Sequence, residues 1–154
     1  MSNKEKIIKK YDKNNNLFYY KDSYYEYWYE YDENNNRVYT KCSDGREIAK
    51  RYDKNNNLIY RKDDYSEKIL EYDKYNNCIH CKESNGYEYW REYDENNKEI
   101  HYKSSMNEEK WYKYYSDGKK CNISKEEFKQ IERKKVKEEF LSRKKCSRFE
   151  IMDI

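Results

Sequence analysis

Short segments in which apolar or aromatic residues alternate with polar ones recur through the first 120 or so residues, and Glu26–Tyr31, with the sequence EYWYEY, is typical. This alternation predicts β-strands. Two kinds of turn separate the strands: a cluster of asparagines, and a Ser-Asp-Gly or Ser-Asn-Gly sequence such as Ser43–Gly45. We expect type I′ turns at the glycine-containing sites. The pattern therefore predicts a mainly β fold, an antiparallel meander of about five hairpin repeats in a twisted or curled single strip.

The hairpins follow an internal repeat of 20 or 21 residues, in which segments such as YDKNNNLIY over Tyr52–Tyr60 recur. The repeat tyrosines are Tyr11, Tyr31, Tyr52, Tyr72, Tyr93 and a degenerate Tyr114. Ten residues after a repeat tyrosine lies the lysine column: Lys21, Lys41, Lys62, Lys82 and Lys103. Five residues before one lies the glutamate column: Glu26, Glu47, Glu67, Glu88 and Glu109. Two invariant charged columns indicate that each position has a role in the repeat.

The asparagine cluster sets how the columns are divided between the faces of the sheet. A three-residue loop over Asn55–Asn57 would pair Tyr52 with Tyr60, and would need one asparagine in the left-handed region. From that pairing, alternation places the repeat tyrosines and the lysine column on one face. The glutamate column, the Asp of each Tyr-Asp and the column Trp28, Ala49, Ile69, Trp90 and Trp111 would then lie on the opposite face.

The basic, tyrosine-rich face is the predicted binding face. Its residues are Tyr31, Tyr39, Lys41, Lys50, Tyr52, Tyr60, Lys62, Lys68, Tyr72, His80, Lys82, Tyr89, Arg91, Tyr93, His101 and Lys103. Tyrosine is a favoured anchor of protein interfaces, and tyrosine with lysine also suits single-stranded nucleic acid. The same residues could instead only stabilise the sheet, because cross-strand tyrosine and lysine packing does so without any partner.

The C-terminal part changes character at Ser124, which with Glu126 and Glu127 predicts the start of a helix reaching about Lys145. Residues 119–154 hold 12 Lys or Arg and 7 Asp or Glu, whereas residues 1–118 hold 22 and 24. We expect this basic helix to cover the tryptophan-bearing face. The predicted organisation is a repeat strip over 1–121, a helix over 122–147 and a tail over 148–154.

The segment Tyr-Asp-x-Asn-Asn-Asn-Leu resembles the YD repeat of Rhs-type proteins, whose pattern is Tyr-Asp-x-Asn-Gly-Asn followed by a hydrophobic residue. Asn15, Asn35, Asn56 and Asn97 stand where that family has glycine, and the match covers about residues 5–120. The resemblance implies a coiling antiparallel β-strip. It does not imply the family's toxin-enclosing shell, because the copies are too few, and no toxin module follows them.

Several chemical sites are disfavoured by the sequence. The five cysteines, an odd number without a secretory segment, indicate reduced thiols. Cys78 and Cys81 are three residues apart on a predicted strand, so they should point to opposite faces and share no metal. Asp53 and the two asparagines at Asn55 and Asn57 match the start of an EF-hand loop, but the required glycine is missing and a turn explains them.

The two histidines occupy a column that is tyrosine in other copies, and neither a nucleophile motif nor a phosphate-binding loop accompanies them. We therefore expect no enzyme, cofactor, metal or small-molecule substrate. The absence of a long apolar run predicts a cytoplasmic protein without a membrane partner. Lys, Asn, Tyr, Ile and Glu dominate, which indicates a low-GC genome.

These expectations favour a non-enzymatic protein-binding module with a protein or ribonucleoprotein partner. A small phage or mobile-element inhibitor of a bacterial defence nuclease, similar to an anti-CRISPR protein, is one such module. The alternatives are a single-stranded nucleic-acid-binding protein that uses the tyrosine and lysine face, and an immunity or adaptor partner of an Rhs-type toxin.

Overall fold

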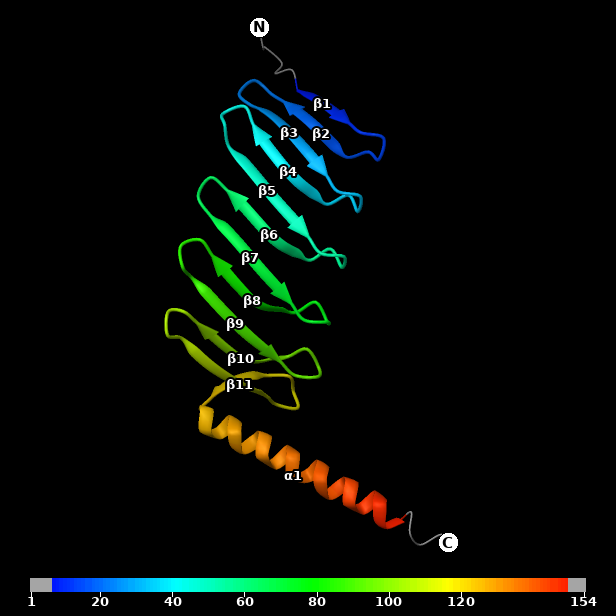
Figure 1. Cartoon of the computed structure of the whole chain (residues 1–154), viewed down its shortest axis with the longest axis vertical. Helices are drawn as coiled ribbons and strands as arrows, with labels where there is room; N and C mark the ends of the chain where they lie inside the picture. The colour runs from blue at the N-terminus through cyan, green and yellow to red at the C-terminus, as the bar shows by residue number, and fades with distance from the viewer. Residues whose placement is uncertain (1–6, 150–154) are drawn as a thin grey trace. The chain divides into compact units, whose positions relative to one another are not determined.

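The computed structural model describes residues 7–149, with side chains described up to Arg143. Within residues 7–149, twelve antiparallel strands follow one another in sequence order in an open meander, and one helix follows them (Figure 1). The strands are β1 (Ile8–Tyr11), β2 (Leu17–Lys21), β3 (Glu26–Tyr31), β4 (Arg37–Cys42), β5 (Glu47–Tyr52), β6 (Leu58–Asp63), β7 (Glu67–Tyr72), β8 (Cys78–Glu83), β9 (Glu88–Tyr93), β10 (Glu99–Ser104), β11 (Glu109–Tyr114) and β12 (Lys120–Ile123). The helix α1 spans Lys125–Phe149. The predicted fold class is therefore confirmed.

The chain divides into two compact units, Met1–Arg91 with Ser104–Asn107 and Glu92–Lys103 with Glu108–Ile154. The first unit holds β1 to β8 and most of β9. The second unit holds most of β10, the strands β11 and β12, and α1. No helix within residues 7–149 is both long enough and apolar enough to cross a bilayer.

Each asparagine loop is a turn closed by the aspartate that follows the repeat tyrosine. In the β5–β6 loop the amide N–H of Asn56 donates to the carbonyl of Asp53, and the N–H of Asp53 donates to the carbonyl of Asn57. Asn56 has a φ of 64°, the left-handed conformation that the sequence predicts for this cluster. The corresponding asparagines are Asn15, Asn35, Asn76 and Asn97, with φ between 59° and 67°. Asparagine tolerates this conformation best after glycine, so it can occupy the position that is glycine in the YD repeat of Rhs-type proteins.

The glycine-containing turns are not of the predicted type I′. Gly45 donates its N–H to the carbonyl of Cys42 and has a φ of 96°, while Asp44 is not among the positive-φ residues of the described chain. A type I′ turn needs a positive φ at both central residues. A type I turn followed by one left-handed glycine fits instead. In the first repeats, turns of this five-residue form alternate with a shorter turn, which begins at Asp22 or Asp63. The difference in turn length explains why the repeat tyrosines are spaced alternately by 20 and 21 residues.

The predicted pairing of Tyr52 with Tyr60 is wrong, because a β-bulge follows each asparagine loop in the first four hairpins. Tyr52 pairs with Leu58 and Arg51 pairs with Tyr60, which leaves Ile59 as the extra residue. An extra residue in one strand turns every later side chain of that strand to the other face. The lysine column therefore lies on the face opposite to the one predicted for it.

The better-packed face of the first unit is the one that carries the repeat tyrosines, and we call it the tyrosine face. Cys42 and Cys81 lie on it, with 2% and 1% of their surface exposed. The parallel rings of Tyr27 and Tyr29 have centroids 6.1 Å apart on the same face. The sheet thus builds its core from small thiols and long amphipathic side chains rather than from a second layer.

Helix α1 begins as predicted at Ser124, whose hydroxyl accepts the backbone N–H of Glu127 at 3.1 Å. Within the second unit the first turns of α1 pack on β11, where the ring of Phe128 lies 4.6 Å from that of Trp111. From Arg133 to Arg143 every residue is exposed. Of the tryptophan column, Trp111 packs against α1 within the second unit, whereas Trp28 and Trp90 of the first unit are about 40% exposed.

Candidate binding surface

The second face of the sheet carries the lysine, glutamate and tryptophan columns together, and we call it the ladder face. Lys41 stands opposite Trp28 on one neighbouring strand and opposite Glu47 on the other. Lys62 stands in the same way between Ala49 and Glu67. The register therefore repeats a fixed cross-strand row of aromatic or apolar residue, lysine and glutamate.

The two invariant charged columns form ion pairs between successive hairpins. Lys41 Nζ lies 3.1 Å from the carboxylate of Glu47, and Lys62 Nζ lies 3.7 Å from that of Glu67. Lys21 and Glu26 form the equivalent pair in the first repeat, and the hydrogen bond from Lys21 raises the pKa of the lysine and lowers that of the carboxyl. These pairs connect one repeat to the next and account for the two charges in the first three repeats.

The column of Tyr39 and Tyr60 also reaches across to neighbouring strands. In the first repeat the hydroxyl of Tyr19 donates to the carboxylate of Glu26 at 2.9 Å. The guanidinium of Arg51 lies 4.3 Å from the centre of the Tyr60 ring, a cation–π contact. His80 replaces tyrosine in this column, and its Nε2 lies 2.8 Å from Glu88. This contact corresponds to the one between the Tyr19 hydroxyl and Glu26. This confirms that His80 substitutes for an aromatic residue.

His101, with 8% of its surface exposed, lies at the centre of a side-chain cluster in the second unit. Its Nδ1 lies 3.0 Å from Glu92 and its Nε2 lies 3.2 Å from Glu109. The ring stacks on Trp111 at a centroid separation of 3.7 Å, and Lys125 of α1 lies 3.4 Å from Glu109. A carboxylate therefore lies within hydrogen-bonding distance of each ring nitrogen. The cluster fastens the start of α1 to β11.

The ladder face of the first unit exposes apolar side chains between its paired charges. Trp28, Ile69 and Trp90 are exposed by 39%, 46% and 40%. Tyr19 packs on Trp28 with a centroid separation of 5.8 Å, and His80 stacks on Trp90 at 5.3 Å. Each tryptophan is thus held by its neighbour while part of its surface meets water. Sequence reasoning missed these three residues because it placed their column under the helix.

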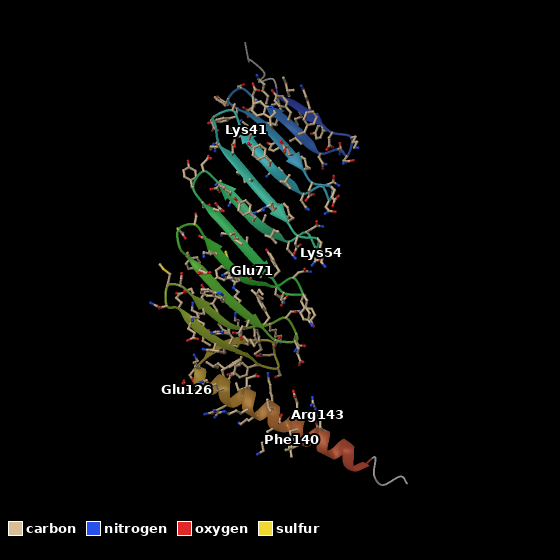
Figure 2. All side chains as sticks on the ribbon, viewed as in Figure 1. Lys41, Lys54, Glu71, Glu126, Phe140 and Arg143 are labelled. Atoms are coloured by element: carbon tan, nitrogen blue, oxygen red, sulfur yellow. The ribbon has the colours of Figure 1, made fainter. Side chains whose placement is uncertain are left out.

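The structure divides the predicted binding residues between the two faces. Those in the columns of the ladder face are Tyr39, Lys41, Tyr60, Lys62, His80, Lys82, His101 and Lys103. Those in the columns of the tyrosine face are Tyr31, Lys50, Tyr52, Lys68, Tyr72, Tyr89, Arg91 and Tyr93. A single surface cannot use both sets of residues. Figure 2 shows the side chains on the strands of the sheet, with Lys41 and Glu71 labelled.

Residues of the tyrosine face have partners inside the sheet. The Tyr31 hydroxyl donates to the carbonyl of Leu17 at 2.9 Å, and the Tyr72 hydroxyl donates to that of Leu58 at 3.1 Å. Lys68 pairs with Glu83 at 2.7 Å. Burial, with the nearby guanidinium groups, lowers the pKa of Lys50. These contacts indicate a structural role for the tyrosine face, so the ladder face is the better candidate surface.

The cysteine pair differs from its predicted arrangement, again because of a bulge after an asparagine loop. Cys78 Sγ lies 3.7 Å from the Tyr89 hydroxyl, and Cys81 interacts with the same hydroxyl. Burial raises the pKa of both the Cys81 thiol and the Tyr89 hydroxyl. Both thiols therefore approach the tyrosine face. Cys42, Cys78, Cys81 and Cys121 form no disulfide, and the described residues contain no cluster of metal ligands.

The residues with EF-hand spacing are used by the turn itself. Asp53 Oδ1 accepts the backbone N–H groups of Asn55 and Asn57, and its Oδ2 accepts the side-chain amide of Asn57. The Asn57 amide also donates to Asn76 of the next loop at 2.8 Å. Asn16 and Asn36 donate to the following loop in the same way. The asparagines thus form a ladder between loops.

No family model matches the chain, and no curated protein matches it in sequence. A chain of the Tc holotoxin pore of Photorhabdus luminescens, solved with a mutation in TccC3, has a similar fold, with a TM-score of 0.61 and 13% sequence identity. The match covers 75% of this chain and only 8% of that one. At this identity the similarity shows the fold alone. The hairpin meander fits the YD-repeat-like fold that the sequence resemblance implies.

Proposed function

We propose that this chain is a non-enzymatic protein-binding module that contacts its partner through the ladder face of the first unit. The observation that carries the proposal is the exposure of Trp28, Ile69 and Trp90 on a regular sheet face. Exposed apolar surface of this kind typically marks an interaction site, and tryptophan is enriched among the residues that dominate binding energy.

The charges around these side chains also suit an interface. Lys41 and Glu47 already pair with each other, as do Lys62 and Glu67. A partner that covers the apolar column therefore does not need to supply a countercharge for each of them. The paired charges form a polar rim, and the partly ordered tryptophans require little further ordering on binding.

The test is a photo-crosslinking residue at position 69, compared with the same residue at Tyr75, an exposed tyrosine of the β7–β8 loop. We expect a specific adduct from position 69 in cells that express the chain. The purified partner should bind the wild-type chain, and Trp90→Ala should weaken that binding at least tenfold, about 1.4 kcal/mol. Equal adducts from both positions, or unchanged affinity for the variant, would reject the ladder face as the site.

The biological class of the partner is a finer part of the proposal. The fold similarity to a chain of a toxin complex favours an adaptor or immunity partner of an Rhs-type toxin. Inhibition of a bacterial defence nuclease, as by phage or mobile-element inhibitors, is the other class that the sequence suggests. Adding the purified chain to the crosslinked partner separates the two, because an inhibitor lowers nuclease turnover and an adaptor forms a complex with a toxin chain.

A further inference from the structure

The second unit contains a charged surface that the ladder face does not use. Between Lys129 and Lys137, helix α1 carries five cationic residues and one carboxylate, Glu132, which already pairs with Lys135 at 3.1 Å. The cations without an ion pair among the side chains described, up to Arg143, are Lys129, Arg133, Lys134, Lys137 and Arg143. All five are exposed.

Helical spacing aligns three of these cations. Lys129, Arg133 and Lys137 are four residues apart in succession, so they follow one another along one side of α1. Like charges at this spacing destabilise an isolated helix. From Arg133 to Arg143 every residue of α1 is exposed, and Figure 2 shows the side chains of Phe140 and Arg143 projecting from its ribbon. The three cations of the row therefore repel one another, and a bound polyanion would offset this repulsion.

We propose that this row binds the phosphate backbone of B-form duplex DNA, with α1 lying along the major groove. An α-helix with its side chains has a diameter of about 10–12 Å, and the major groove is about 12 Å wide. Exposed Lys and Arg on a helix are the groups that contact DNA phosphates. This site goes beyond the proposed protein-binding function and uses none of its residues.

The arrangement of apolar residues distinguishes DNA from a membrane surface. A helix that lies on a membrane separates its apolar side chains onto one face. The exposed Val136 and Phe140 lie on the same side of α1 as Lys129 and Arg133, and the exposed Leu141 points to another side. Apolar and cationic side chains are therefore not separated onto different faces. Duplex RNA should not bind in this way, because its deep, narrow major groove does not admit a helix.

The test uses the full chain and fluorescence anisotropy with short labelled duplexes of DNA and of RNA at several salt concentrations. The variant combines Lys129→Gln, Arg133→Gln and Lys137→Gln, which retain helix propensity. The control combines Lys13→Gln, Lys54→Gln and Lys74→Gln, which remove the same charge from exposed asparagine loops. Circular dichroism verifies that both variants keep the wild-type fold.

We expect the wild-type chain to bind duplex DNA with micromolar or weaker affinity at physiological salt and more tightly at low salt. The helix variant should reduce the log–log salt slope by about 2.7, since each phosphate contact contributes about 0.9. The loop control should retain the wild-type slope. Equal loss in the control, equal affinity for duplex RNA, or binding only to phosphatidylserine vesicles would each overturn the proposal.

Discussion

Lys41 and Glu47 stand directly opposite each other on β4 and β5, with 3.1 Å between the lysine nitrogen and the carboxylate. The same relationship links Lys21 with Glu26 and Lys62 with Glu67. Each pair joins the end of one hairpin to the start of the next. Contacts between repeats thus explain lysine and glutamate at these positions in the first three repeats.

Exchanging the charges of one pair tests this explanation. Glu67→Lys alone places two lysines opposite each other on β6 and β7 and should destabilise the fold by about 0.2–1 kcal/mol. The double exchange Lys62→Glu with Glu67→Lys should recover most of the loss, because the pair is exposed and its partners are equivalent. Urea unfolding of the four proteins gives the coupling energy. A coupling of zero would show that the columns are invariant for another reason.

The repeat tyrosine should contribute through its hydroxyl. Tyr72→Phe removes the donor to the Leu58 carbonyl and should cost about 1 kcal/mol, the net contribution of a typical hydrogen bond. Tyr75→Phe is the control, since Tyr75 is 53% exposed in the neighbouring loop. Thermal or urea unfolding measures both. Equal effects of the two changes would contradict a structural role of the Tyr72 hydroxyl.

The left-handed conformation of Asn56 predicts which of two variants at this position is the more stable. Asn56→Ala should be less stable than Asn56→Gly by about 1–2 kcal/mol, because alanine at a φ of 64° meets the steric penalty that glycine escapes. At Asn55, which does not have a positive φ, the order should reverse, with the alanine variant the more stable. The same order at both sites would contradict the loop conformation.

The aspartates of the loops predict how stability depends on acid. The backbone N–H of Asn16, with further hydrogen bonds from this loop, lowers the pKa of Asp12. A lowered folded-state pKa gives stability that is present above the unfolded value, about 3.9, and is lost as the pH falls through the folded value. Denaturation midpoints should therefore stay level near neutrality and fall below about pH 4.

A variant with asparagine in place of the four asparagine-loop aspartates that have a lowered pKa separates this effect from other carboxylates. The changes are Asp12→Asn, Asp32→Asn, Asp53→Asn and Asp73→Asn. Each new side chain keeps one acceptor oxygen and loses its titration. The variant should show a shallower loss of stability in acid. An acid profile as steep as that of the wild type would place the effect elsewhere.

Two tryptophans of one column should contribute differently to the stability of the fold. Trp111 contacts both His101 and Phe128, whereas Trp90 stacks on His80 and is 40% exposed. Trp111→Ala should destabilise its unit by about 3 kcal/mol, and Trp90→Ala by less than half of that. The helical signal in circular dichroism during thermal unfolding reports the first change. A larger cost at Trp90 would contradict the exposure of the ladder face.

The elements of the fold could be predicted from the sequence because their signals are local. The alternation around Trp28 identifies a strand, Ser124 marks the helix start, and Asn56 marks a left-handed turn. The faces could not be derived in this way, because one extra residue at Ile59 reverses the alternation that follows it. The charges held a usable signal: Lys41 and Glu47 flank one short turn with opposite signs, as a cross-strand pair does.

The bulge itself is the centre of this account, and Ala49, the single alanine of the chain, reports on it directly. With the bulge, Ala49 lies opposite Tyr39 on one side and Lys62 on the other. Selective ¹³C labelling of alanine gives one methyl signal for nuclear Overhauser measurements. With the bulge in place, this methyl should show Overhauser contacts to the Tyr39 ring and the Lys62 side chain. Contacts to Asp63 in place of Lys62 would show an unbulged hairpin and would contradict the ladder face.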